Sequence, residues 1–148
     1  MMQATIKGYP LRHLMVVTAN GTIDLENSKA AMKRLAADPD FDWSSEVLLD
    51  CRGIECELST FDVFVLAISM AFPHPALPTY QRVALLVDKQ SPGHFAFDHA
   101  RFLQLCAENR GVNIRAFENY QSADAWLMAE LPEDPRDLCV PPVQRKAT

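Results

Sequence analysis

Four short apolar runs, separated by stretches with helical periodicity, constrain the fold of this chain more than any other feature. The runs are "HLMVVTA", "EVLLDC", "RVALLVD" and "NIRAF", and each has the length and apolar character of a strand inside a sheet. Strands that alternate with helices form a largely parallel sheet, because each parallel crossover needs a connection long enough to hold a helix. The sequence therefore predicts an α/β fold.

The predicted order of elements is ββαβαβαβα, in a mixed, mostly parallel sheet of about five strands with about four helices. A first strand at residues 6–12 precedes the run at 13–19 and should add an antiparallel edge. The helices are expected at residues 25–37 with Asp24 as N-cap, then at 59–72, 91–111 and 121–131. Residues 1–131 are thus predicted to form one domain, followed by a proline-rich tail at 132–148. The strand order, and whether the tail packs on the domain, stay open.

The charge balance and the apolar pattern exclude several classes of protein. The 14 basic and 19 acidic residues give a net charge of −5, so no basic field favours nucleic acid. The first residues lack the charged start and apolar run of a signal peptide. The longest apolar block, residues 63–72, is half the length of about 20 residues that a membrane span needs. A cytoplasmic protein without an integral membrane segment is expected.

The four cysteines do not indicate a metal site or a disulfide framework, because none of them has CxxC spacing. We expect no cofactor and no metal. Cys51 and Cys56 flank a loop that a helix containing His94 should approach, which would place a thiol near a base. No catalytic signature accompanies them, so neither cysteine is predicted to be a nucleophile, and the chain is expected not to be an enzyme.

The ordered set of motifs resembles a known family. The pattern "VVTANGTID…LLDCRGI…STFDVFVLA…RVALLVD…FAFDHARFLQLCAENRGVNIRAFENYQSADAWL" is similar to the SpoIIAA-like fold of STAS domains, found in anti-sigma-factor antagonists. The resemblance is strongest to small stand-alone bacterial members of unassigned function. These end in a strand and helix matched here by Arg115, Phe117, Ala123, Trp126 and Leu127. It implies a non-catalytic module, and more distant relatives of the fold bind lipids or other apolar ligands.

Ser59 has two interpretations. In the anti-sigma antagonists a "DSSG" loop carries a serine that a kinase phosphorylates, and the resemblance places that serine at Ser59. Leu58 and Phe61 replace the aspartate and the glycine of that motif. The residues alone predict a capping box, in which Ser59 caps the helix and Asp62 reciprocates. Ser59 is therefore both a predicted N-cap and a candidate regulatory site.

A candidate ligand pocket lies at the carboxyl ends of the parallel strands, where open α/β sheets bind their ligands. This edge should gather two cations and two predicted helix N-termini, which together suit an anionic group. The candidate pocket residues are Arg52, Lys89, Ser91 and His94.

The helix "VFVLAISMAF" is apolar on every face, whereas a helix that covers a single sheet normally exposes a polar face to solvent. Something must cover it: a loop, the tail, a second copy of the chain, or an apolar ligand. The candidate interaction surface is Phe61, Phe64, Val65, Ile68 and Phe72. The leading hypothesis is a STAS-like interaction module, as a homodimer or with another protein partner. The alternative is a carrier or sensor of a small apolar or amphipathic ligand.

Overall fold

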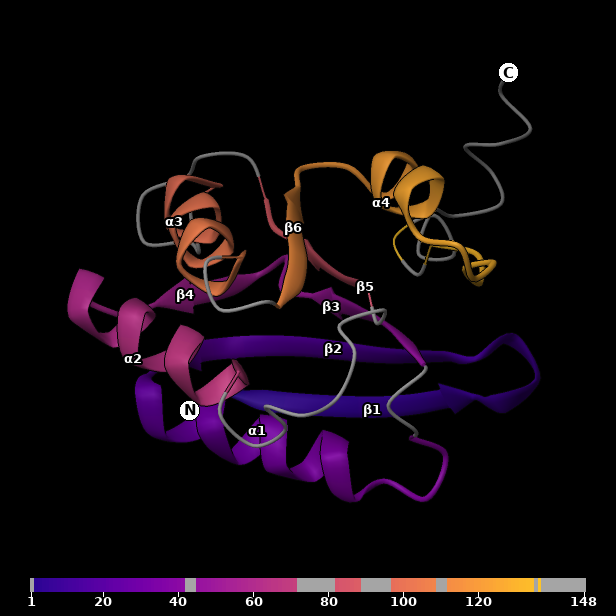
Figure 1. Cartoon of the computed structure of the whole chain (residues 1–148), viewed down its shortest axis with the longest axis horizontal. Helices are drawn as coiled ribbons and strands as arrows, with labels where there is room; N and C mark the ends of the chain where they lie inside the picture. Colours follow the sequence, from indigo (N-terminus) through magenta and orange to yellow (C-terminus); the bar gives the residue numbers. More distant parts are fainter. Residues whose placement is uncertain are drawn as a thin grey trace, which may run out of the picture.

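The sheet begins with an antiparallel hairpin that projects from the body of the molecule (Figure 1). The computed structural model describes residues 2–41, 45–71, 82–88, 97–108, 112–134 and 136. Strands β1 (Gln3–Tyr9) and β2 (Leu14–Ile23) are joined by a single 3-10 turn, Pro10–Arg12. The predicted bounds, 6–12 and 13–19, are shifted because Pro10 lacks the amide that a further ladder bond would need. His13 closes the turn in a left-handed conformation, with φ at 50°.

The remaining strands are parallel to β2 and complete the predicted mixed sheet. They are β3 (Glu46–Asp50), β5 (Arg82–Leu86) and β6 (Asn113–Phe117), and the strand order is β1-β2-β3-β5-β6. A three-residue strand that the sequence did not predict, β4 (Ile54–Cys56), pairs with the far end of β2. It forms because β2 extends past β3, which leaves Gly21–Ile23 without a partner on that side.

Three helices build the larger core on one face of the sheet. They are α1 (Leu25–Ala37), α2 (Thr60–Ala71) and α3 (Phe97–Glu108), and Figure 1 shows α2 between the other two. Alternate residues of each strand face this core, as Met15 and Val17 of β2 do. From α2 and α3, Val63 and Ala100 pack there with no exposed surface. The three helices thus form the helical layer on this face of the sheet.

In the described part of the chain, one short helix, α4 (Tyr120–Trp126), packs on the opposite face. Leu14 and Val16 of β2 face this side and form a second, smaller core with Ala123 and Leu127. Trp126 is half-buried against Phe117, with ring centroids 5.6 Å apart. The prediction that Trp126 and Leu127 pack on the sheet is confirmed, although the helix ends at Trp126 rather than near Leu131.

The helix termini follow the side-chain chemistry of the sequence. Asp24 caps α1 in a capping box with Asn27, in which each side chain accepts a 2.8 Å bond from the other's amide. Asn119 caps α4 by accepting a 2.7 Å bond from the amide of Ser122. The predicted start of α3 at Ser91 lies outside the described residues. None of the helices in the described ranges combines the length and apolar character that crossing a bilayer requires.

Candidate functional site

The outer face of α2 carries exposed aromatic side chains. Phe61 is 71% exposed and Phe64 is 37% exposed, whereas Val63 and Leu66 are buried against the sheet. Val65, one turn after Phe61, is half-buried. Because residues three and four apart share one side of a helix, Phe61, Phe64 and Val65 form one apolar patch. We call these three residues the α2 patch.

Two residues of the predicted interaction surface cannot be placed on this patch. Phe72 lies outside the described residues, and so does the side chain of Ile68. The sequence left open which half of the apolar helix faces the sheet. The structure shows that Val63 and Leu66 belong to the inner half and Phe61 and Phe64 to the outer half.

Ser59 lies directly before the α2 patch and closes a capping box. Its hydroxyl accepts a 3.1 Å hydrogen bond from the amide of Asp62, and the Asp62 carboxylate accepts one of 3.1 Å from the amide of Ser59. The predicted cap is confirmed. Ser59 is also exposed, so its hydroxyl lies at the surface beside the α2 patch. Its role as a regulatory site stays a prediction.

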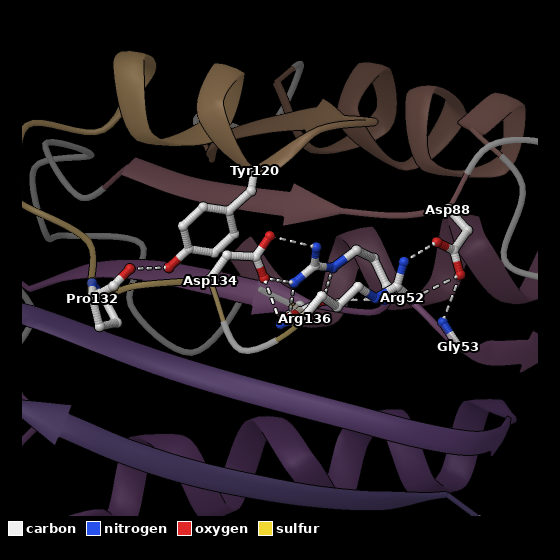
Figure 2. Close-up of polar contacts among 8 residues, drawn as sticks. Arg52, Gly53, Asp88, Tyr120, Pro132, Asp134 and Arg136 are labelled. Atoms are coloured by element: carbon white, nitrogen blue, oxygen red, sulfur yellow. Dashed lines mark hydrogen bonds and ion pairs between the residues drawn. The ribbon is translucent and has the colours of Figure 1, made fainter. Parts of the chain in front are cut away.

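The carboxyl edge of the sheet holds a network of ion pairs, which we call the Arg52 clasp (Figure 2). Arg52 follows β3 and binds two carboxylates. Its Nε and Nη2 donate to Asp50 at 2.9 and 2.8 Å, and its Nη1 and Nη2 donate to Asp134 at 3.1 and 2.7 Å. All three side chains are about 90% or more buried. Arg52 therefore faces protein carboxylates, not an open ligand pocket.

An aromatic ring and a second ion pair extend the clasp. The Arg52 guanidinium lies 5.6 Å from the ring centroid of Tyr120, whose hydroxyl donates to the carbonyl of Pro132. Arg136 binds Asp88, two residues after β5, through Nη1 at 2.8 Å and Nη2 at 3.2 Å. Asp88 also accepts a 2.9 Å bond from the amide of Gly53, whose φ of 87° favours glycine. The segment after α4 is thus held to two neighbouring strands.

The clasp changes the titration of its members. Hydrogen bonds from Arg52 hold the pKa of Asp134 below its usual range, against the opposing effect of burial. Burial, and then the nearby charge of Asp134, raises the pKa of Tyr120 to about 12. Burial alone would lower the pKa of Arg52, but the hydrogen bonds to Asp50 and Asp134 outweigh it and raise that pKa. At neutral pH the Arg52 guanidinium and the Asp134 carboxylate are therefore both charged, beside a neutral Tyr120 phenol.

The other three predicted pocket residues stay untested. Lys89, Ser91 and His94 lie outside the described residues. Cys51 is half-buried and packs against the larger core, while the side chain of Cys56 is outside the described set. Within the described ranges, no group of three or more His, Cys, Asp or Glu side chains is placed to hold a metal ion.

A groove of about 390 Å³ lies on the face of the sheet that carries α4. Side chains of β1, β2 and β3 line it on one side, and Tyr120, Pro132 and Glu133 line it on the other. The clasp thus borders the groove, because Asp50 and Tyr120 belong to both. Sequence analysis missed this groove and the clasp partners of Arg52. The only local signal was Asp50-Cys-Arg52, a carboxylate and a cation with one residue between them at the end of a buried strand.

Comparison with known proteins identifies the fold. The structure is similar to that of an uncharacterised protein of the DUF3478 family with a SpoIIAA-like fold from Shewanella loihica PV-4. The TM-score is 0.50 at 15% sequence identity, and the match covers 85% of this chain and 93% of the other. This chain has a SpoIIAA-like fold. No family model and no curated protein sequence matches it. The predicted fold class is confirmed, and the comparison carries no function.

Proposed function

We propose that this SpoIIAA-like protein is a non-enzymatic, cytoplasmic interaction module that associates through the α2 patch, with a second copy of the chain as its partner. The exposure of Phe61 and Phe64 carries this proposal. Full burial of a large apolar side chain contributes roughly 1.5–3 kcal/mol, so the mostly exposed Phe61 favours association, and the partly exposed Phe64 adds a smaller contribution. Twofold homodimers are the commonest soluble assemblies, and they bury the same patch of both subunits.

The chemistry of the clasp supports a non-catalytic role. A general acid must reach the substrate with a proton to donate, and a general base or nucleophile must reach it with an available lone pair. Asp50, Arg52 and Asp134 are instead buried and bonded to one another. These groups stabilise the fold at the edge where many α/β enzymes place their catalytic residues.

The position of Ser59 supports a regulatory role in the same association. A phosphate at Ser59 would sit at the N-terminus of α2, where the helix dipole favours negative charge. It would also add about −1.5 to −2 charges beside Phe61, and these would have to be desolvated when the α2 patch is covered. We propose that phosphorylation of Ser59 weakens association without unfolding α2.

Sedimentation velocity over a range of concentrations tests the assembly. The wild type should form dimers, and Phe61→Glu and Phe64→Glu should each shift it to monomers with unchanged far-ultraviolet circular dichroism. Met128→Glu is the matched control, because Met128 is 80% exposed but follows α4 on the other face of the sheet. A wild type that stays monomeric at every concentration, or equal loss of dimer in the Met128→Glu control, contradicts the proposal.

The alternative function, binding a small apolar or amphipathic ligand, is favoured by the groove on the face opposite α2. This site does not depend on the α2 patch. Native mass spectrometry separates the two functions, because it reports subunit count and bound small molecules in the same measurement.

A further inference from the structure

The groove exists because α4 covers only half of its face of the sheet. The rows of side chains on this face cross the strands in register: Thr5–Thr18–Asp50 and Lys7–Val16–Leu48. Both rows continue into β5, where Ala84 and Leu86 are buried against α4. Over β1 no helix of the described chain packs on this face, whereas Leu14 and Val16 of β2 are buried in the core that α4 completes.

The open part of the sheet has a floor and two rims. Val16, which is 9% exposed, and Leu48, which is 1% exposed, lie at the bottom of the groove. One rim is the β1 row Thr5, Lys7 and Tyr9, whose alternate positions share one face of the strand. These three residues span about 13 Å at the usual rise of about 3.3 Å per residue. The groove is therefore long enough for a chain of several carbon atoms.

The second rim is held in place by the clasp. It consists of the ring of Tyr120 and the segment Pro132–Glu133. The Tyr120 hydroxyl is bonded to the Pro132 carbonyl, and the adjoining Asp134 is bonded twice to Arg52. A rim fixed by these bonds does not have to be ordered when a ligand enters, which lowers the cost of binding.

The polar groups along the β1 rim favour an anion. Among the described residues the Lys7 ammonium pairs with no carboxylate; it lies over the ring of Tyr9, 5.3 Å from the centroid. The hydroxyls of Thr5 and Thr18 face each other across β1 and β2 and have no hydrogen-bond partner in the described part of the chain. Two acidic residues of the described chain line the groove: Asp50 is paired with Arg52, and Glu133 lies on the opposite rim, away from the β1 row.

We propose that this groove binds a small amphipathic anion. Its carboxylate or phosphate head contacts Lys7 and the hydroxyls of Thr5 and Thr18, and its apolar body lies along the groove against Tyr9 and Pro132, above Val16. The charged head thus matches the polar rim of the groove, and the apolar body matches its apolar lining. This site is separate from the α2 patch, because the sheet lies between them.

Three probes of matched structure test the proposal by amide chemical-shift titration of the full chain. Octanoate carries both halves of the ligand, octanol lacks the charge, and acetate lacks the apolar body. Octanoate should shift the amides of β1, β2 and β3 around the groove and bind more tightly than either of the other two. Equal affinity for acetate and octanoate overturns the proposal, and so does equal affinity for octanol and octanoate.

Variants locate the binding. Lys7→Gln should weaken the binding of octanoate by about fivefold, the upper range for an exposed ion pair, and leave the affinity for octanol unchanged. Thr18→Phe should fill the floor and abolish the shifts for octanoate and octanol alike. Lys33→Gln is the control, because Lys33 is exposed on α1 on the other face. Shifts confined to α2, or equal octanoate affinity in Lys7→Gln and Lys33→Gln, overturn the proposal.

Discussion

Arg52 and Asp134 are 82 residues apart in the sequence, yet two hydrogen bonds of 3.1 and 2.7 Å join their side chains. Asp50 binds the same guanidinium from the end of β3. One arginine thus ties the segment after α4 to the centre of the sheet. The stability of the domain and the shape of the groove both depend on this contact.

Removing one carboxylate from the clasp should destabilise the domain. Asp134→Ala should lower the free energy of unfolding by about 2 kcal/mol, because hydrogen bonds to charged groups contribute about 1.5–3 kcal/mol. Arg52→Met should cost more, about 3–5 kcal/mol, since it leaves two buried carboxylates facing each other without a cation. Urea denaturation measures both. The exposed neighbour provides the control, and Glu133→Ala should stay within about 0.5 kcal/mol of the wild type.

The stabilisation from Asp134 should depend on pH in a defined direction. Its pKa in the folded state is lowered by the bonds from Arg52, whereas in the unfolded chain it titrates near the ordinary value of about 3.9. The contribution is therefore complete above that ordinary value and is lost as the pH falls through the folded-state pKa. The stability difference between wild type and Asp134→Asn should be larger at about pH 7 than at about pH 3. A difference that is constant across this range would show that the Asp134 charge contributes nothing.

Tyr120 should ionise later than an ordinary tyrosine. Burial and the charge of Asp134 raise its pKa to about 12, against an ordinary value of about 10. The difference in ultraviolet phenolate absorbance between wild type and Tyr120→Phe should titrate near this higher pKa in folded protein and near the ordinary value in denaturant. Because the unfolded chain loses this proton first, stability should fall as the pH rises between the two values. A folded-state midpoint near the ordinary value would contradict the burial of this ring.

Local patterns in the sequence were sufficient to predict most of the fold. Apolar runs such as "VLLD" and "RVALL" marked the parallel strands, and Asp24 marked the start of α1 because a short acidic side chain suits an N-cap. The sequence failed where the deciding interaction is not local. β4 has three residues and forms only because β2 extends past β3, which no pattern within Ile54–Cys56 indicates.

The candidate site was less predictable than the fold, for the same reason. Arg52 was predicted to line a ligand pocket. Nothing in the sequence of residues 132–136 indicated that Asp134 would pair with it. That segment has no periodicity, and its position is set by contacts to Tyr120 and Asp88. In contrast, the sequence did predict that α2 exposes apolar surface, because an all-apolar helix on a single sheet cannot bury every face, although it left open which half is exposed.

The last prediction separates the two roles of Ser59. Ser59→Ala should lower the free energy of unfolding by about 1 kcal/mol, because the amide of Asp62 loses its partner at the start of α2.

Ser59→Asp should keep most of this stability, since aspartate caps a helix as well as serine does. It should nevertheless weaken association, because it places a charge beside Phe61, the most exposed residue of the α2 patch at 71%. Ser59→Asn is the matched control, since it caps equally well without the charge and should dimerise like the wild type. Urea denaturation and sedimentation velocity on the same three variants give both quantities. If Ser59→Asp and Ser59→Asn dimerise equally, the charge at this position does not regulate assembly, and Ser59 is only the cap of α2.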